Sequence, residues 1–276
     1  MAKIKIGSLN CHGQSKMSTA KQLFIESILK QSKQDILCLQ ETFIDDETFE
    51  NCDYLTANYN IIKNNNINNY GTACLVKNIF NINDIRIDTE GRIIIFNLGD
   101  VTITNVYPKA GTDSESRKHR ENMFSQTIPN MLRLRKKQLI LAGDWNCITD
   151  KKDCTHHYEM KMSPSLKRLI TLLGVKDDFR TLHKDLCHFS RYYSKQASQE
   201  GATRIDRIYS SDNLIPISAK YIPAAMSDHM LCEVVLRIKE TLEVISIPKP
   251  KLPFKIRPSI VDNADFQNEV KHLIKE

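Results

Sequence analysis

Apolar residues recur with two different periods along residues 1–240, and the change of period marks the expected helices and strands. Apolar runs and a period of two predict strands at residues 4–9, 35–41, 59–63, 72–77, 92–98, 101–107, 139–143, 188–193, 203–211 and 230–238. A helical period predicts helices at residues 18–33, 114–137 and 163–174. This order predicts an α/β fold, a four-layered sandwich of two packed, mostly antiparallel β-sheets flanked by helices.

The helical segments differ in how clearly their ends are marked. Residues 163–174 begin with Ser163 as an N-cap and end at Gly174, which is a common helix terminator. Residues 114–137 have a basic face that solvent can cover, and Pro129 should kink or end that helix. The first helix should turn four apolar side chains inward: Leu23, Phe24, Ile28 and Leu29.

The pattern changes after the last predicted strand. Residues 241–276 begin with a proline- and lysine-rich stretch that suits a linker, and residues 262–276 have the apolar spacing of a short amphipathic helix. We therefore expect one domain over residues 1–240 and a linker that leads toward a further domain.

Composition narrows the class of protein. The chain has 276 residues, 41% of them hydrophobic, which suffices for a sizeable core. The first residues enter a strand pattern directly, so we expect no signal peptide, no membrane span and an intracellular protein. The eight cysteines contain no Cys-x-x-Cys pair and are expected to be reduced thiols. The net charge of +6 is compatible with a polyanionic partner but is also common without one.

Polar side chains recur at the ends of the predicted strands. They are Asn10, Glu41, Tyr107, Asp144, Asn146, Asp206, Asp228 and His229. Each has an ordinary structural explanation when taken singly, such as a turn residue or, for Asp206 between Arg204 and Arg207, a salt-bridged strand end. Strand ends can share one rim of a sheet, so we expect these side chains to converge on one pocket.

Six short motifs in order along residues 3–238 resemble those of the endonuclease/exonuclease/phosphatase superfamily, the DNase I-like fold of the exonuclease-III-type abasic-site endonucleases. They are LNCHG with Asn10, LQET with Glu41, NVYPKAG with Tyr107, AGDWN with Asp144 and Asn146, TRIDRIY with Asp206, and SDHM with Asp228 and His229. A single motif of this kind would be weak, whereas six in the family's order are specific.

Within that superfamily, RIDRIYSS followed by SDHMLCEV is most similar to the endonuclease domain of LINE-type non-LTR retrotransposons. In that group a proline-rich basic linker follows the nuclease and leads to a reverse transcriptase, as residues 241–276 would here. The resemblance implies an amino-terminal part of a longer polypeptide that carries the reverse transcriptase. It also implies synthesis in the cytoplasm, action on chromosomal DNA in the nucleus, and no membrane partner.

The resemblance implies a role for each strand-end residue. Glu41 would be the main ligand of Mg²⁺, with Mn²⁺ as a substitute, and Asn10 and Asp228 would lie in the same metal and phosphate shell. Asp144, aided by Asn146, would activate the attacking water. The remaining residues would act on the phosphate, His229 and Tyr107 by hydrogen bonds and Asp206 by supporting His229.

The implied substrate is double-stranded DNA. Nicking would leave a 3′-hydroxyl and a 5′-phosphate, and a 3′-hydroxyl is the primer that target-primed reverse transcription needs. Much of the affinity should come from phosphate contacts and should fall with salt.

Other functions stay open at this point. An abasic-site repair endonuclease would use the same catalytic set. A phosphoesterase for inositol lipids or sphingomyelin is a further alternative, although TRIDRIY lacks the Pro-Ala-Trp-type sequence that inositol phosphatases carry before the corresponding Asp. A catalytically silent binding module would be expected to have lost some of these polar residues. A zinc site is a weak alternative because no common finger has the spacing of Cys147, Cys154, His156 and His157.

One motif departs from the family. Before the strand at 188–193, many relatives have a threonine where this chain has Cys187 or His188. The loop over residues 194–202, just before TRIDRIY, is placed to contact a DNA groove or to be a long hairpin turn.

Overall fold

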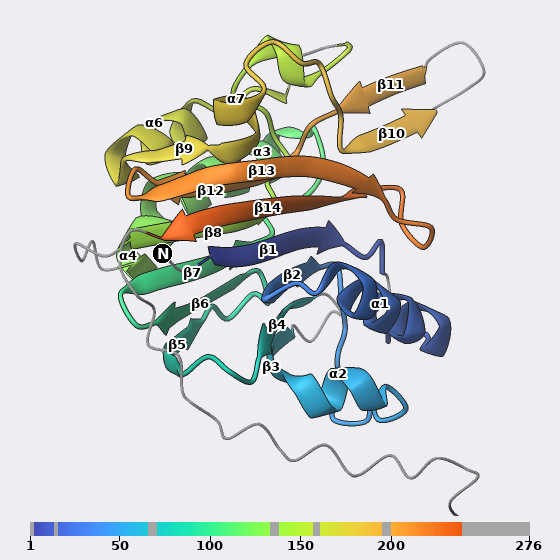
Figure 1. Ribbon diagram of the computed structural model, residues 1–276. Coiled ribbons are helices and arrows are strands. Elements are labelled where there is room, and N and C mark those ends of the chain that lie inside the picture. Colours follow the sequence, from blue (N-terminus) through green and yellow to red (C-terminus); the bar gives the residue numbers. More distant parts are fainter. Residues whose placement is uncertain are drawn as a thin grey trace, which may run out of the picture. The chain divides into compact units, whose positions relative to one another are not determined.

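A computed structural model describes residues 3–13, 16–65, 71–132, 138–156, 161–194 and 200–238 (Figure 1). The predicted linker and helix at residues 241–276 lie outside the described residues, as does most of the loop at 194–202. The elements within the described part form two six-stranded sheets, a two-stranded hairpin and short helices.

The first sheet contains a central parallel pair. Its strand order is β13 (Leu214–Pro223), β14 (Met230–Ile238), β1 (Lys3–Asn10), β2 (Ile36–Gln40), β4 (Gly71–Lys77) and β3 (Tyr59–Asn65). β1 and β2 run parallel, and every other neighbouring pair is antiparallel.

The second sheet repeats this arrangement. Its order is β5 (Ile82–Ile87), β6 (Ile93–Leu98), β7 (Val101–Val106), β8 (Gln138–Asp144), β12 (Asp206–Ser211) and β9 (Val175–Asp177). β7 and β8 are parallel and the other pairs are antiparallel. A hairpin of β10 (Arg191–Ser194) and β11 (Glu200–Thr203) leads into β12.

Three apolar clusters define the layers. Ile6 of β1 and Ile140 of β8 belong to a core between the two sheets. Leu39 of β2 packs in a second cluster with helices α1 (Thr19–Ser32) and α2 (Asp53–Asn58), and Leu141 of β8 packs in a third with the helices of the other side. Period-two alternation divides each strand between two clusters. The predicted four-layered α/β sandwich is therefore confirmed, with one parallel pair in each sheet.

Helix α1 starts after the N-cap Ser18, whose hydroxyl accepts from the Lys21 N–H. Leu23, which we expected to point inward, is instead 48% exposed, and Ile25 is buried in its place. The 3.6-residue period explains this, because Ile25 and Leu29 share a face that Leu23 does not.

The long helix expected at 114–137 is broken into three. α3 (Ser114–Asn122) continues into a π-helical turn, η1 (Met123–Thr127), and then α4 (Ile128–Leu132). The wide turn ends with the Ile128 N–H bonded to the Met123 carbonyl, directly before Pro129, which has no N–H to donate. Helix α6 (Pro164–Leu173) has the predicted ends, with Ser163 as N-cap and Gly174 left-handed at φ 62°.

The remaining short elements connect the layers. They are η2 (Lys151–Asp153) and α7 (Asp178–Leu182). All eight cysteines are free thiols, and seven of them are buried. In the described part of the chain, no helix has the length and apolarity that crossing a membrane requires.

Candidate active site

Strand direction brings the predicted residues to one edge of the sandwich. Carboxyl ends of a parallel pair lie at the same edge as the amino end of an antiparallel neighbour. In the first sheet this edge carries Asn10, the last residue of β1, Glu41 after β2, and His229 before β14. In the second sheet the same rule applies to Tyr107 after β7, Asp144 at the end of β8 and Asp206 at the start of β12.

Alternation within the strands then turns Asn10, Asp144 and Asp206 between the sheets. Asp144 and Asp206 are directly opposite in the β8–β12 register, so they share a face with Ile140 and Ile208 of the inter-sheet core. Both carboxylates are almost fully buried. Burial and the neighbouring Asp206 raise the pKa of Asp144 although His229 opposes the rise, as expected for a carboxylate held near another carboxylate away from water.

Asn10 joins the carboxylates of the two sheets. Its Nδ2 donates to Oε1 of Glu41 at 3.0 Å and to Oδ2 of Asp144 at 2.9 Å. Its Oδ1 accepts from the His12 N–H at 2.8 Å, so in this arrangement Asn10 aligns both carboxylates through its amide nitrogen. The Tyr107 hydroxyl donates to the same Oε1 of Glu41 at 2.6 Å. Burial, then Glu41 and Asp144, raise the pKa of Tyr107, which keeps it a donor.

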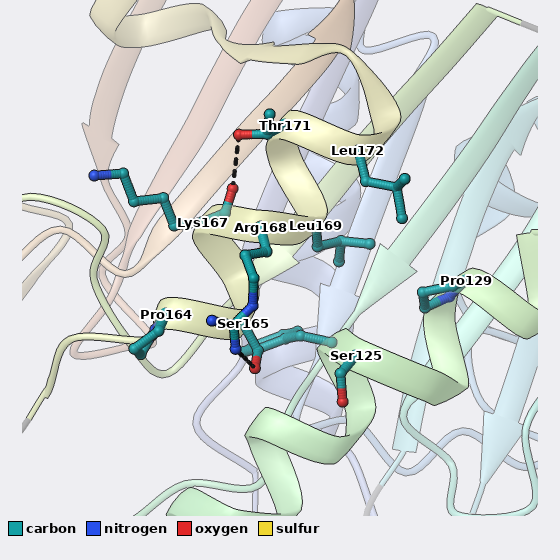
Figure 2. A pocket seen from close by; sticks show the side chains of 10 residues that line it. Ser125, Pro129, Pro164, Ser165, Lys167, Arg168, Leu169, Thr171 and Leu172 are labelled. Carbon is teal, nitrogen blue, oxygen red and sulfur yellow. Dashed lines mark hydrogen bonds between the residues drawn. The ribbon is translucent and has the colours of Figure 1, made fainter.

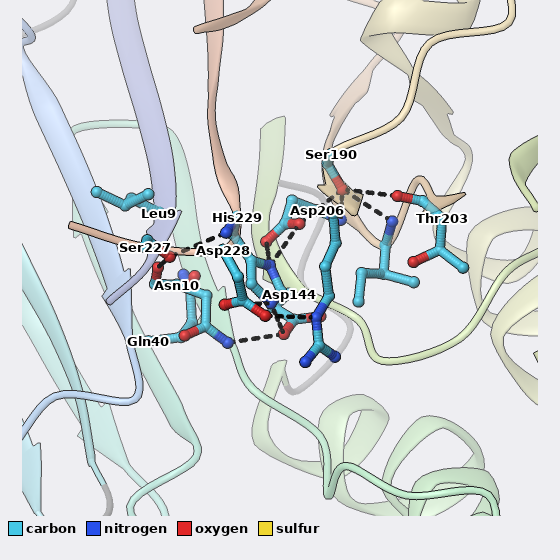
Figure 3. Close-up of polar contacts among 12 residues, drawn as sticks. Leu9, Asn10, Gln40, Asp144, Ser190, Thr203, Asp206, Ser227, Asp228 and His229 are labelled. Atoms are coloured by element: carbon cyan, nitrogen blue, oxygen red, sulfur yellow. Dashed lines mark hydrogen bonds and ion pairs between the residues drawn. The ribbon is translucent and has the colours of Figure 1, made fainter. Parts of the chain in front are cut away.

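His229 and Asp206 form a buried pair (Figure 3). Nδ1 of His229 lies 2.8 Å from Oδ2 and 3.1 Å from Oδ1 of Asp206. Burial alone would lower the pKa of His229, but the charges of Asp206 and Asp144 outweigh it and raise this pKa to about 9. The Nε2 side of the protonated ring faces Oδ2 of Asp144 across 4.0 Å.

Asp206 does not pair with the flanking arginines. Arg204 binds Asp153 and Asp177, and Arg207 donates to the Cys147 carbonyl and Thr149. A second donor to Asp206 is instead Ser190, whose hydroxyl lies 2.6 Å from Oδ2. The sequence pattern missed Ser190 and placed Cys187 or His188 at the position of the usual threonine. His188 stacks on Tyr221, with ring centroids 5.3 Å apart.

Asp228 lies beside His229 but is bound on two sides. Nε of Arg191 donates to its Oδ2 at 2.9 Å, and Nδ1 of His12 lies 3.0 Å from its Oδ1. Burial would raise the pKa of Asp228, but His229 and Arg191 outweigh it and lower this pKa. Neither Arg191 nor His12 was among the predicted site residues. For Arg191, nothing in a linear pattern indicates that the β10 hairpin reaches this edge, whereas His12 lies inside the LNCHG motif, two residues after Asn10.

The chain turns sharply after two of these strands. Glu41 and Asn146 both have φ of 49°, a left-handed conformation that is uncommon for residues other than glycine. Asn146 donates through Nδ2 to the Pro108 carbonyl at 2.9 Å, and its N–H binds Oδ1 of Asp144. Asn146 thus holds Asp144 and the loop after Tyr107 in place. Strain of this kind persists where surrounding contacts determine the conformation.

Gln40, the residue before Glu41, forms a buried amide pair with Asn105. Gln40 donates through Nε2 to Oδ1 of Asn105 at 2.8 Å, and Nδ2 of Asn105 donates to the carbonyls of Leu39 and Ala73. Asn105 belongs to β7, whereas its partners belong to β2 and β4. These bonds connect the two sheets close to the strand ends that carry Glu41 and Tyr107.

A metal ion has suitable donors here. Among the described residues, Asp144, Asp206 and His229 form a group whose ligand atoms all lie within 4.8 Å of one another. Two of those three are already hydrogen-bonded to each other, and protonation of His229 disfavours a metal–nitrogen bond. Glu41 and Asp144, which converge on the Asn10 amide, offer the carboxylate oxygens that Mg²⁺ prefers. The weak zinc alternative gains no support, because Cys147, Cys154 and His156 do not form a metal-binding group among the described residues, and His157 lies outside them.

Two surface cavities differ in their relation to this site. One of about 400 Å³ adjoins it and is lined by Cys11, His12, Gly13, Lys16, Met17, Ser18, Lys21, Glu41, Thr42 and Phe43. The other, of about 760 Å³, lies on the outer helices η1, α4 and α6, where Phe124, Pro129 and Leu169 line it (Figure 2). None of the predicted site residues lines this second cavity.

Comparison with known families gives the geometry its context. Residues 7–229 match the model of the Endonuclease/Exonuclease/phosphatase family. The chain belongs to this family. Membership indicates a hydrolase that acts on phosphodiester bonds, and all the predicted strand-end residues lie inside the matched range. A search of curated proteins found no match.

Solved structures of similar fold agree with the observed architecture. An AP endonuclease from Archaeoglobus fulgidus has a TM-score of 0.69 at 19% identity, covering 86% of this chain and 100% of that one. A 3′ phosphatase, NExo, from Neisseria bound to product DNA hairpin gives the same four values. Truncated TDP2 from Caenorhabditis elegans has a TM-score of 0.62 at 21% identity, covering 85% of this chain and 97% of that one. At these identities the likeness establishes the DNase I-like fold.

Proposed function

We propose that this family member is a divalent-metal-dependent DNA endonuclease that nicks double-stranded DNA. The main observation is the buried Asp206–His229 pair that faces Asp144 across 4.0 Å, with Glu41 joined to Asp144 through Asn10. A protonated imidazole and two carboxylates in one recess suit the hydrolysis of a phosphodiester, where negative charge builds up on phosphate oxygens.

Each side chain would have a distinct task. Asp144 accepts the proton of a water that attacks phosphorus, and its raised pKa suits a general base. His229 donates from Nε2 to a non-bridging oxygen, while Asp206 on Nδ1 fixes the ring and its charge. Tyr107 donates a hydrogen bond that holds Glu41 in position. The bond from phosphorus to the 3′ oxygen then breaks, and that oxygen takes a proton from solvent to become the 3′-hydroxyl.

Glu41 would hold the metal ion, with Mg²⁺ the expected ion and Mn²⁺ a substitute, while Asp144 keeps its role as the base. When bound, such an ion neutralises charge on the phosphate and on the departing oxygen. The tasks of the chain's own residues stay the same, since Asn10 keeps both carboxylates directed to one point.

The biological role that we propose is to start target-primed reverse transcription of a non-LTR retrotransposon. Support comes from the resemblance of RIDRIYSS and SDHMLCEV to LINE-type endonuclease domains. The partner would be a reverse transcriptase in the same full-length polypeptide, and the site of action would be chromosomal DNA in the nucleus. The 5′-phosphate and 3′-hydroxyl ends match this role, because the polymerase extends a 3′-hydroxyl.

Abasic-site repair is the second candidate. The similar structures include an AP endonuclease, and such an enzyme would require the same catalytic groups. Its substrate differs only in lacking one base, so the two functions diverge in the loops around the site.

Nicking of a supercoiled plasmid tests the proposal. Wild type with Mg²⁺ should convert undamaged plasmid to open circles, whereas excess chelator or His229→Ala should abolish the conversion. A duplex with one abasic site, compared with the matched intact duplex, separates the candidates. Cleavage confined to the abasic duplex would support repair, and no cleavage of either by a folded protein would refute DNA endonuclease activity.

A further inference from the structure

Arg191 extends the site beyond the predicted residues. It is the first residue of β10 and follows Ser190, the donor to Asp206. Its backbone is bridged to His229, and the Met230 N–H donates to the Ser190 carbonyl at 2.7 Å. The start of the hairpin is therefore attached to the same short segment that carries Asp228 and His229.

The Arg191 side chain is held by one edge only. Nε donates to Oδ2 of Asp228 at 2.9 Å, and the side chain remains 35% exposed. Among the described residues, its two Nη groups have no hydrogen-bond partner. An arginine held through Nε keeps the pair of Nη donors that matches two oxygens of a phosphate.

Charge at this edge is mainly negative, so an anionic ligand needs additional cations there. Glu41, Asp144, Asp206 and Asp228 gather at one edge, and the protonated His229 balances only part of that charge. Burial would lower the pKa of Arg191, but Asp228, Asp144 and Glu41 raise it overall, so its cation lies in the field of all three carboxylates. A phosphodiester that enters this recess needs cations nearby, because carboxylates repel it.

We propose that Arg191 binds the scissile phosphate of the DNA through its two Nη groups, and that Asp228 is the positioning residue that aims it. This assignment rests on the proposed nicking of DNA. The family resemblance implied that Asp228 lies in the metal shell, whereas in this assignment Asp228 positions Arg191. Nδ1 of His12 lies 3.0 Å from the other oxygen of Asp228.

A phosphate-by-phosphate binding experiment tests the assignment. Once the nick is mapped, duplexes carry one neutral methylphosphonate at the scissile position or at a flanking one, and affinity is measured by fluorescence anisotropy in chelator. For wild type, neutralising the scissile phosphate should weaken binding about tenfold, the scale of one charge-assisted contact. Arg191→Gln should bind the unmodified duplex about tenfold more weakly and be less sensitive at that position alone, because only the His229 contact to this phosphate remains.

Three variants give the experiment its controls. Arg191→Lys keeps the positive charge but lacks the pair of Nη donors, so its affinity should lie between those of Arg191→Gln and wild type. Asp228→Asn should show the same positional loss in smaller degree, because the neutral side chain still accepts a hydrogen bond from Nε. Arg168→Gln, which removes an arginine from the outer helix α6, should match wild type. Circular dichroism confirms that each variant is folded.

The outcomes separate the two proposals. If wild type neither binds nor nicks DNA, the proposed function fails. If wild type nicks DNA and Arg191→Gln retains full affinity and full sensitivity at the scissile position, the assignment of Arg191 is wrong and the nuclease stands. A positional loss that moves to a flanking phosphate also overturns it.

Discussion

Oδ2 of Asp206 accepts hydrogen bonds from two side chains, Ser190 and His229. These two donors replace the water that the buried carboxylate has lost. A buried charge without partners would be costly, whereas these two donors, one of them an imidazolium, satisfy it. The carboxylate in turn fixes which imidazole nitrogen faces the recess. The chemistry of His229 therefore depends on residues that never touch the phosphate.

Replacement of Asp206 by asparagine tests this dependence. An amide cannot favour the imidazolium, so the rate of nicking should fall at least about 10²-fold, the low end of a general acid–base contribution. Ser190→Ala should cost less, because His229 keeps its carboxylate. The measurement is single-turnover nicking of plasmid with Mg²⁺. Full turnover by a folded Asp206→Asn protein would contradict the role of the pair.

The pH dependence of stability follows from the same pair. The pKa of His229 is about 6.5 in an unfolded chain and about 9 in the folded protein, so protonation favours the folded state. This contribution is complete below about pH 6.5 and is lost as pH rises toward 9. Urea unfolding at several pH values should show wild type losing stability over that window. Asp206→Asn should lose less, and parallel curves for the two proteins would contradict the coupling.

The strand-end residues could be predicted because each lies at one end of an apolar strand, and this pattern is visible in the sequence itself. Ser190 and Arg191 carry no such signal. Their roles depend on the way the hairpin folds back onto the segment before β14, which involves residues almost forty positions apart. For that reason, the motif comparison placed the position of the family's threonine at Cys187 or His188.

At the scale of elements, the approach of β7 and β8 sets the spacing of the site. Gly143 is opposite Val106 in this parallel pair, one residue before Asp144, and a Cβ on Gly143 would overlap the Val106 carbonyl oxygen. Backbone atoms cannot give way as the end of a side chain can. The pair therefore requires glycine at this position.

Gly143→Ala should separate the ends of β7 and β8 and displace Asp144 relative to Tyr107. We expect a loss of about 1–3 kcal/mol in the free energy of unfolding, typical of overpacking, together with a large loss of nicking by the folded fraction. Gly7→Ala is the matched control, since its Cβ would meet only side chains, chiefly Leu37 and Leu231. Equal nicking rates for both variants would show that the β7–β8 contact does not position the site.

Element prediction succeeded where burial was complete and failed at the exposed edges. The strands predicted at 72–77, 92–98 and 101–107 are almost wholly buried. β5 has mostly exposed residues, and β13 contains Pro216 and Pro223, so neither has the apolar alternation of a buried strand. The short edge strand β9 follows a helix terminator and was missed for the same reason.

At the scale of the whole molecule, the site is shared by both sheets. Glu41 belongs to one sheet and Asp144 to the other, and Asn10 and Asn105 bridge them. A ligand that binds both carboxylates therefore stabilises the closed sandwich relative to the unfolded chain.

Mg²⁺ should raise the melting temperature of wild type. At a concentration near 100 Kd the ion adds about 2.7 kcal/mol, a rise of roughly 5 to 10 °C for a domain of this size. Glu41→Gln keeps an oxygen to accept from Asn10 and Tyr107 but lacks the charge, so its melting temperature should respond much less. Differential scanning fluorimetry with Mg²⁺ or chelator measures this, and equal shifts in both proteins would exclude Glu41 as a ligand.

The pairing of β1 with β14 has a consequence for the timing of synthesis. Asn10 leaves the ribosome early, but its neighbour strand and the segment with Asp228 and His229 leave last among the described elements. A nascent chain therefore holds an incomplete set of catalytic groups through most of translation. With the proposed function, nuclease activity would begin only when β14 has docked, and a truncated or stalled product would not cut DNA.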